Sequence, residues 1–331
     1  MSIRLTTVAA AAVLSGVAGF KALSPHGSDR VRVGFLVKMP EQAWFISEVA
    51  AAQAAGRAGN FDVIAIGTPD GERLMTAIDN LVAQGAQGFI VCAPDVRLGP
   101  AVVARSALAG LKVITVDDQF LGPGGKPLTD VPHLGMSGYK IGQQVGSSLI
   151  AEMRQRRWSY SEVGAIALTA NELPTAVERV AGARDTLLAA GFPSRNIFEA
   201  PQRATDTESA SNAASPVLSR QNEFKKWIIF ALNEESVLGA VRACEQFGLT
   251  ANQVIGVGIG GSSTSMAEFS KSQPTGFYAT VAVSSSLHGR AAVANLVKWI
   301  REGARPALNT ETTGTLMTRA NWREVKADLQ L

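Results

Sequence analysis

The sequence is poor in the residues that build metal sites and disulfides. Its 331 residues include two cysteines, Cys92 and Cys244, and three histidines. His26, His133 and His288 stand far apart along the chain, without the close ligand spacing of a metal-binding motif, so we expect no metal or other cofactor. An exported protein could pair the two cysteines. A domain of this size does not need a disulfide, however, and the sequence leaves the pairing open.

Sequence signatures of catalysis are also missing. There is no nucleophile elbow and no P-loop, and the glycine run Gly256–Gly261 lacks the G-x-G-x-x-G spacing of dinucleotide sites. A tight strand-to-helix turn explains that run better. The pair Asp117–Asp118 could form a catalytic dyad, but neighbouring residues of a strand point to opposite faces. One ligand carboxylate and one helix cap are the favoured interpretation, and we expect no enzymatic activity.

The chain also has little excess of positive over negative charge. The net charge is +3 at neutral pH, and it falls to +1 without Arg4 and Lys21 of the N-terminal segment. Such a balance argues against a nucleic-acid-binding surface.

The N-terminal segment differs from the rest of the chain. Arg4 precedes an apolar stretch of mostly small residues, Leu5–Gly19, which is short for a transmembrane span. It is typical of a secretory signal peptide, which we place at residues 1–22, cut between Gly19 and Ser28, so the mature chain is expected in the periplasm. An uncleaved N-terminal anchor helix is the alternative. No cysteine lies near the cut for a lipid anchor.

Apolar strand patterns and helical patterns alternate from residue 31 onward, and the order begins again near residue 163. This repetition predicts an α/β protein with two doubly wound parallel-sheet lobes. Strands are expected at Val31–Val37, Phe61–Ile66, Gly88–Cys92, Lys112–Val116 and Val131–Met136, and again at Val163–Leu168, Trp227–Leu232 and Gln253–Ile259. Helices are expected at Gln42–Arg57, Glu72–Ala83, Tyr139–Arg154 and Thr175–Ala190.

Several of these strands finish at a polar residue, at the sheet edge where open α/β sheets bind ligands. The strand ends in question are Lys38, Cys92, Asp117–Asp118, Thr169 and Asn233. Helix capping is the alternative for Asp, Asn and Thr, but Lys38 and Arg179 cannot accept an amide hydrogen. Two aromatics, Trp44 and Phe45, follow Lys38. A cation beside a flat aromatic face suits a ligand with hydroxyls and an apolar face, such as a sugar.

Five stretches make the chain similar to type I periplasmic sugar-binding proteins of ABC importers, and within that family to its L-arabinose-binding members. They are Gly34–Glu41 (GFLVKMPE), Pro69–Glu72 (PDGE), Val116–Phe120 (VDDQF), Ala167–Leu173 (ALTANEL) and Gly276–Tyr278 (GFY). The resemblance implies two lobes joined by a hinge, with residues 30–137 plus 283–312 in one lobe and 138–282 plus 313–331 in the other. It implies a monomer that captures a pyranose of L-arabinose, D-galactose or D-fucose shape and delivers it to an ABC permease.

The resemblance also implies a role for individual residues. Lys38 hydrogen-bonds sugar hydroxyls, Trp44 and Phe45 pack on the sugar, and Asp118, next to Asp117, accepts from the anomeric hydroxyl. Arg179 donates to the ring oxygen and Asn233 reaches ring hydroxyls. Cys92, Met136 and Thr175 lie beside the ligand.

Three residues depart from the family pattern. Gln42 replaces a glutamate, Gly260 an asparagine and Leu232 a methionine. We expect Gly260 to leave empty volume in the pocket wall and the preference among sugars to change.

Other functions on the same fold are presenting sugar to a membrane chemosensor and converting sugar enzymatically. A sugar-responsive repressor would need an N-terminal helix-turn-helix in place of the apolar segment.

Overall fold

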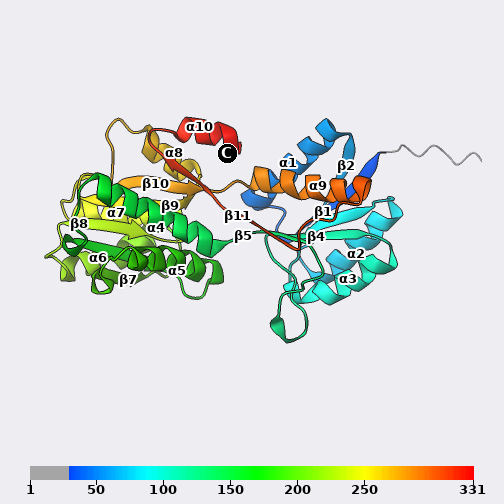
Figure 1. Cartoon of the computed structure of the whole chain (residues 1–331), viewed down its shortest axis with the longest axis horizontal. Coiled ribbons are helices and arrows are strands. Elements are labelled where there is room, and N and C mark those ends of the chain that lie inside the picture. Colours follow the sequence, from blue (N-terminus) through cyan, green and yellow to red (C-terminus); the bar gives the residue numbers. More distant parts are fainter. Residues whose placement is uncertain (1–29) are drawn as a thin grey trace, which may run out of the picture. The chain divides into compact units, whose positions relative to one another are not determined.

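The computed structural model describes residues 30–331 (Figure 1). The expected signal peptide lies outside the described residues. Within them, no helix is both long enough and apolar enough to cross a membrane.

The first sheet has six strands in the order β11-β5-β4-β3-β1-β2, and all of its neighbouring strands run parallel. Its strands are β1 (Val31–Val37), β2 (Phe61–Gly67), β3 (Gly88–Cys92), β4 (Lys112–Val116), β5 (His133–Met136) and β11 (Asn309–Thr312). Strand β3 is buried along its whole length, as in a sheet covered on both faces.

The second sheet has the order β12-β10-β9-β8-β6-β7 and is parallel except for β12, which pairs antiparallel with β10. Its strands are β6 (Val163–Thr169), β7 (Ile197–Pro201), β8 (Lys226–Phe230), β9 (Val254–Gly260), β10 (Phe277–Ala282) and β12 (Thr315–Thr318).

Helices cover both faces of each sheet. On the first sheet, α1 and α9 enclose one apolar core, and α2 and α3 enclose the other. On the second, α4 and α5 cover one face, and α6, α7 and α8 the other. The helices are α1 (Ala43–Gly59), α2 (Gly71–Ala83), α3 (Gly99–Leu108), α4 (Gly138–Gln155), α5 (Pro174–Ala189), α6 (Thr207–Arg220), α7 (Glu234–Gln246), α8 (Ser263–Ser270), α9 (Ser285–Glu302) and α10 (Trp322–Leu329).

The chain passes from one sheet to the other between β5 and α4, between β10 and α9, and between β11 and β12. Two doubly wound, mainly parallel sheets joined by crossing segments confirm the predicted fold class.

Glycines let two pairs of helices pack closely, α4 against α5 and α9 against α1. A Cβ on Gly142 of α4 would lie 2.1 Å from the carbonyl oxygen of Arg179 on α5. A Cβ on Gly289 of α9 would lie 2.1 Å from the carbonyl oxygen of Glu48 on α1. Both distances are far below van der Waals contact, so these positions admit no larger residue without moving a helix.

The glycine run Gly256–Gly261 also serves packing. A Cβ on Gly256 would meet Val237 at 2.8 Å, and one on Gly258 would meet the Cα atom of Glu234 at 3.0 Å. The run therefore lets α7 lie close against β9, and it ends in the turn before α8, as the sequence predicted.

Candidate functional site

The carboxyl edge of the first sheet brings a lysine and an aspartate together. The Lys38 ammonium, directly after β1, donates to Oδ2 of Asp118, just beyond β4, and forms an ion pair with it. Burial lowers the pKa of Lys38, but the hydrogen bond and the negative charges around it outweigh burial and raise that pKa overall. The Cys92 thiol donates to the same oxygen at 3.4 Å. Burial, with the charges of Asp117 and Asp118, raises the pKa of Cys92 far above its usual range, so it remains a thiol.

A tight turn centred on Asp117 points the side chains of the two aspartates in different directions. The backbone N–H of Asp118 donates to the carbonyl oxygen of Val116 at 2.7 Å, and Asp117 between them has a φ of 61°. This is the pattern of a γ-turn with positive φ, which is rare and strained. Such strain costs on the order of 1–3 kcal/mol and concentrates at functional sites. The turn directs Asp118 toward Lys38 and Asp117 toward Trp44.

The prediction that one of the two aspartates caps a helix is wrong. The two Asp117 carboxylate oxygens lie 3.2 and 3.3 Å from the Trp44 indole Nε1, which donates to them.

Trp44 is half-buried in the first turn of α1. Phe45 beside it is only 4% exposed and packs in the core of the first sheet, while Gln42 is exposed and makes no capping hydrogen bond in the described chain.

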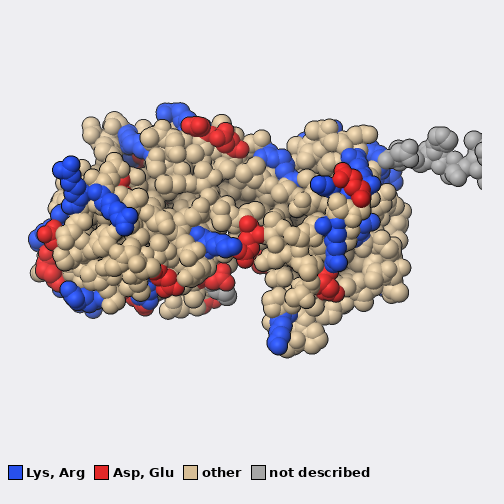
Figure 2. Space-filling model, viewed as in Figure 1, with Lys and Arg blue, Asp and Glu red and all other residues tan. Residues whose placement is uncertain are grey.

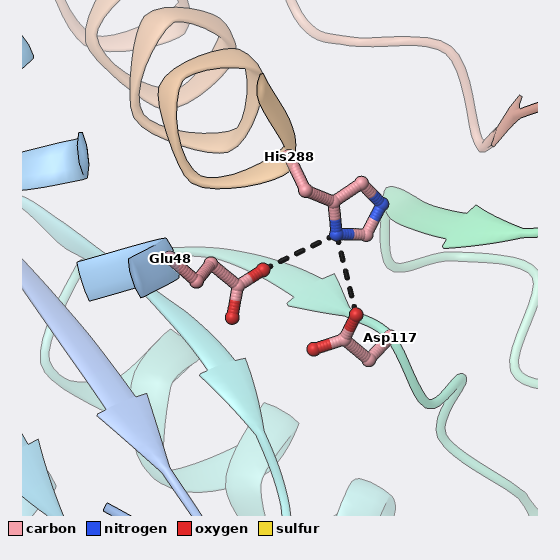
Figure 3. Close-up of side chains that lie close together, drawn as sticks. All are labelled: Glu48, Asp117 and His288. Atoms are coloured by element: carbon pink, nitrogen blue, oxygen red, sulfur yellow. Dashed lines mark hydrogen bonds and ion pairs between the residues drawn. The ribbon is translucent and has the colours of Figure 1, made fainter. Parts of the chain in front are cut away.

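Behind Asp117 lies a buried histidine–carboxylate cluster that the sequence did not predict (Figure 3). The His288 Nδ1 atom lies 3.2 Å from Oε1 of Glu48 and 3.2 Å from Oδ1 of Asp117. Glu48 is 0% exposed and His288 is 2% exposed. Figure 3 shows them converging from α1, α9 and the end of β4.

The charges of this cluster depend on one another. Burial alone would lower the pKa of His288, but its hydrogen bonds to Asp117 and Glu48 outweigh burial and raise that pKa to about 9. Burial raises the pKa of Glu48 to about 7. Atoms of the three side chains lie within 4.8 Å of one another, close enough to share a metal ion. Both 3.2 Å contacts are made by Nδ1, whose single N–H is shared by the two carboxylates, while the buried Nε2 atom has no hydrogen-bond partner among residues 30–331.

The free energy of unfolding is therefore expected to fall as pH rises from about 6.5 to 9. Unfolded His288 loses its proton near pH 6.5, whereas folded His288 keeps it to about pH 9. The folded state binds more protons in this window, so stability present below pH 6.5 is lost as pH rises through 9. At about 1.4 kcal/mol per pKa unit, the loss is at most about 3.5 kcal/mol. Denaturant titrations across this window check the slope, which His288→Asn should flatten. An equally steep slope in that variant contradicts the assignment.

Arg179 projects from the second turn of α5, a helix that covers one face of the second sheet. Its Nη1 atom donates to the carbonyl oxygen of Leu232 at 2.8 Å. The buried Nε atom finds no hydrogen-bond partner among residues 30–331. Burial lowers the pKa of Arg179, and the nearby Glu178 acts in the opposite direction. Thr175, one turn earlier on the same helix, is exposed.

Three further predicted residues occupy structural positions. Asn233 caps α7: its Oδ1 atom accepts from the backbone N–H of Ser236 at 3.0 Å, and its Nδ2 atom donates to the carbonyl oxygen of Thr205 at 2.8 Å. The capping interpretation thus holds for Asn233. Leu232 is 8% exposed and packs with two alanines. Met136 ends β5 and packs against an apolar cluster of the second sheet.

The expectation of empty volume at Gly260 is wrong. A Cβ there would lie 2.9 Å from Cδ of Glu234 and 3.1 Å from each carboxylate oxygen. The Glu234 side chain is 1% exposed. Its carboxylate accepts from the backbone N–H groups of Gly261 at 2.6 Å and Ser262 at 3.1 Å, and from the Ser262 hydroxyl at 2.5 Å. The space that a side chain would take is filled by this carboxylate.

Both cysteines are buried and free, Cys92 on the first sheet and Cys244 on α7. On the face shown in Figure 2, charged side chains of both signs are scattered, without a broad basic patch.

The structure thus brings Lys38, Cys92, Asp118 and the Asp117–Trp44 pair together at the edge of the first sheet, and Arg179 next to Leu232 on the second. An ion pair at the strand ends of one sheet and a partly buried arginine on a helix covering the other, in two lobes joined by crossing segments, are typical of a class of protein that holds a small polar ligand.

Sequence comparison gives the family. A family model described as periplasmic binding proteins and sugar binding domain of LacI family matches residues 30–324, and the chain belongs to this family. An ABC transporter L-arabinose-binding periplasmic protein of Azospirillum brasilense is 58% identical over 299 residues, covering 90% of each chain. The L-arabinose-binding periplasmic protein of Escherichia coli K12 is 43% identical over 298 residues, again covering 90% of each chain.

Structure comparison agrees on the fold. A periplasmic ribose ABC transporter protein of Conexibacter woesei superimposes with a TM-score of 0.72 at 17% identity, over 90% of this chain and 95% of its own. This confirms the type I periplasmic binding protein fold. With relatives named for binding, the protein is a binding protein and not an enzyme.

Proposed function

We propose that this protein captures a monosaccharide of the L-arabinose, D-galactose or D-fucose shape in the periplasm and delivers it to an ABC importer. The observation that carries the proposal is the ion pair of Lys38 and Asp118 beside Trp44, in a chain 58% identical to a protein named for binding L-arabinose. Export by the N-terminal segment, residues 1–22, belongs to the same proposal, as does a monomeric binding protein that meets the permease subunits.

A neutral sugar needs donors and acceptors that are already fixed in place. Lys38 offers donors only and Asp118 acceptors only, so one hydroxyl can accept from the first and donate to the second. Hydrogen bonds to charged groups contribute roughly 1.5–3 kcal/mol each. The half-buried Trp44 ring provides a flat surface for the apolar face of the sugar. Its tilt is set by the bonds between its indole N–H and Asp117.

Arg179 supplies the matching donor on the other lobe. In this proposal the side chain reorients on binding, so that the Nε atom, buried and without a hydrogen-bond partner among residues 30–331, donates to a ring oxygen. In this proposal, residues 30–137 plus 283–312 form one lobe and residues 138–282 plus 313–331 the other, and the sugar binds between them. Thr175, Asn233 and Gly260 line the second lobe, with Asn233 limited to what its capping bonds leave free.

The core residue Phe45 acts differently from the stacking role that the resemblance implies. At 4% exposure it supports the first turn of α1 from below, and Trp44 provides the contact surface. Gln42, exposed at the start of α1, is free to reach a hydroxyl.

A thermal-shift screen tests the proposal. A ligand that binds only the folded state raises the melting temperature by mass action, in proportion to RT ln(1 + [L]/Kd). We expect one or a few aldoses of the arabinose or galactose shape to raise the Tm by several degrees at millimolar concentration, and chromatography to return the sugar unchanged. No shift with any pentose or hexose, beside a clear shift with an amino acid or an anion, would overturn the proposed function.

A further inference from the structure

His288 and Glu48 do not belong to the set of residues that the sequence pointed to, yet they contact it. His288 lies in the first turn of α9, which follows one of the crossing segments, and Glu48 lies on α1, one turn after Trp44. The two are 240 residues apart in the chain and 3.2 Å apart in the structure. Because they are 2% and 0% exposed, neither can touch a ligand bound at the strand ends. Any effect on the ligand must pass through Asp117 or Trp44.

The contacts form one continuous path to the aromatic surface. Glu48 faces the His288 imidazole, and the imidazole faces Oδ1 of Asp117 (Figure 3). The Asp117 carboxylate in turn accepts the indole N–H of Trp44. The rings of Trp44 and His288 also meet edge to face, with centroids 6.1 Å apart. The orientation of the indole is therefore held from two sides by the same histidine.

The same path fixes the turn that presents Asp118. Asp117 has a φ of 61°, a conformation that L-residues avoid unless surrounding contacts hold it. Its side chain is anchored by Trp44 and His288, and the backbone N–H of the next residue is bound to Val116. Without the imidazole, the carboxylates of Glu48 and Asp117 would face each other in a buried place and repel.

A close approach of α9 to α1 makes the contact possible. Gly289, next to His288, leaves no room for a Cβ beside the Glu48 carbonyl oxygen. The geometry is thus built into the helix packing and does not depend on a flexible surface side chain.

We propose that Glu48 and His288 are positioning residues of the ligand site, which hold the Asp117 carboxylate so that it orients the Trp44 indole and fixes the turn carrying Asp118. This inference rests on the proposed function for its effect on sugar affinity. The part of the inference that concerns the orientation of Trp44 does not depend on sugar binding.

Other charged groups surround the cluster and bear on any pH profile. Lys38 and Asp118 form their own pair beyond Asp117, and Cys92 contacts Asp118. His133 on β5 is buried with its Nδ1 atom 2.9 Å from the Thr115 hydroxyl, and burial lowers its pKa. Glu311 on β11, paired with Lys140, faces His133 from the next strand. Because these groups would also contribute to a pH profile, the test uses the signal of the Trp44 indole as its main readout.

The experiment follows the Trp44 indole N–H by nitrogen-15 NMR in the unliganded protein. The chain has five tryptophans, and the signal that Trp44→Phe removes is the one to follow. In the native protein this proton, bonded to a carboxylate, should resonate downfield. We expect His288→Leu to move it upfield and to weaken sugar binding at least tenfold. His288→Asn, whose side-chain amide can donate to the same carboxylates, should recover much of both effects.

A matched control separates positioning from simple loss of a buried ion pair. Glu152→Gln alters a carboxylate on α4, beside the second sheet, that is 6% exposed and lies 2.7 Å from Arg156. It should lower stability without moving the Trp44 signal or the affinity. If His288→Leu does not fold, Glu48→Gln, which keeps the shape and removes the charge, provides the same readouts. We then expect a smaller upfield shift and a threefold or greater loss of affinity.

Two results would overturn the inference. One is an unmoved Trp44 signal in folded His288→Leu and Glu48→Gln. The other is a moved signal with unchanged affinity in a protein that binds sugar normally. Failure of the native protein to bind any sugar would instead remove the proposed function, while the indole signal would still decide whether the cluster orients Trp44.

Discussion

Replacing Arg179 by alanine is expected to weaken sugar binding by roughly 30- to 3,000-fold, the equivalent of about 2–5 kcal/mol. The Nε atom of Arg179 is buried and has no hydrogen-bond partner within residues 30–331, and only Nη1 is used, on Leu232. An unsatisfied buried donor costs free energy in the unliganded protein, which a ring oxygen would recover on binding. The loss therefore falls mainly on the complex.

Stability should change much less than affinity in this variant. Arg179→Ala removes one hydrogen bond from a charged donor to a carbonyl, worth roughly 1.5–3 kcal/mol, and relieves the burial of a charge, which offsets part of that loss. Arg184→Ala is the matched control, because Arg184 lies on the same helix and pairs with Glu199 at 2.7 Å near the surface. It should leave affinity within about twofold. A folded Arg179→Ala protein with native affinity, or an unfolded one, would make Arg179 a structural residue.

Substituting asparagine for Gly260 is expected to destabilise the protein by about 2–4 kcal/mol, because overpacking a filled site and breaking buried hydrogen bonds add together. The new Cβ would lie 2.9 Å from Cδ of Glu234, and the carboxylate would have to leave the N–H groups of Gly261 and Ser262. Restoring the residue of the family pattern should therefore not by itself restore the family's sugar preference.

A compensating change should rescue that variant. Glu234→Asp shortens the side chain by one methylene and moves the carboxylate away from position 260. The double variant is expected to recover at least half of the lost stability. Gly248→Asn controls for replacing a glycine at positive φ in open space, since Gly248 has a φ of 78°, against 159° at Gly260, and nothing within 4 Å of its missing Cβ. It should cost at most about 1 kcal/mol. A Gly260→Asn protein as stable as the native one would mean that Glu234 moves aside freely.

The sheets were predictable because their strands are short apolar runs ended by polar or turn residues. β1, β3 and β4 begin and end at the predicted residues, and Lys38 follows β1 as expected. By contrast, β11 and β12 had no signal in the sequence. β11 is a largely exposed polar strand, and β12 buries only Met317. Each has four residues and pairs with a strand far away in the chain, so neither is long enough to show an apolar alternation.

The candidate site was predictable in its polar strand ends and not in its supports. Strand alternation predicted that Asp117 and Asp118 point apart, and they do, although a positive-φ turn causes it. Glu48 lies within the helix expected at Gln42–Arg57 without a feature that marks it, and His288 is one of three histidines far apart along the chain. Nothing in the sequence linked residues 240 apart whose contact depends on how closely α1 and α9 pack. Likewise, the volume beside Gly260 depends on where Glu234 points.

Isothermal titration calorimetry of the purified native protein with L-arabinose, D-galactose, D-fucose and D-ribose tests the central claim most directly. We expect 1:1 binding of at least one of the first three sugars with a dissociation constant in the micromolar range or below. The same sugar should bind at least tenfold more weakly to Asp118→Ala, since that change leaves Lys38 without its acceptor. An absence of heat with every aldose, or equal affinity in Asp118→Ala, would contradict a sugar site built on the pair of Lys38 and Asp118.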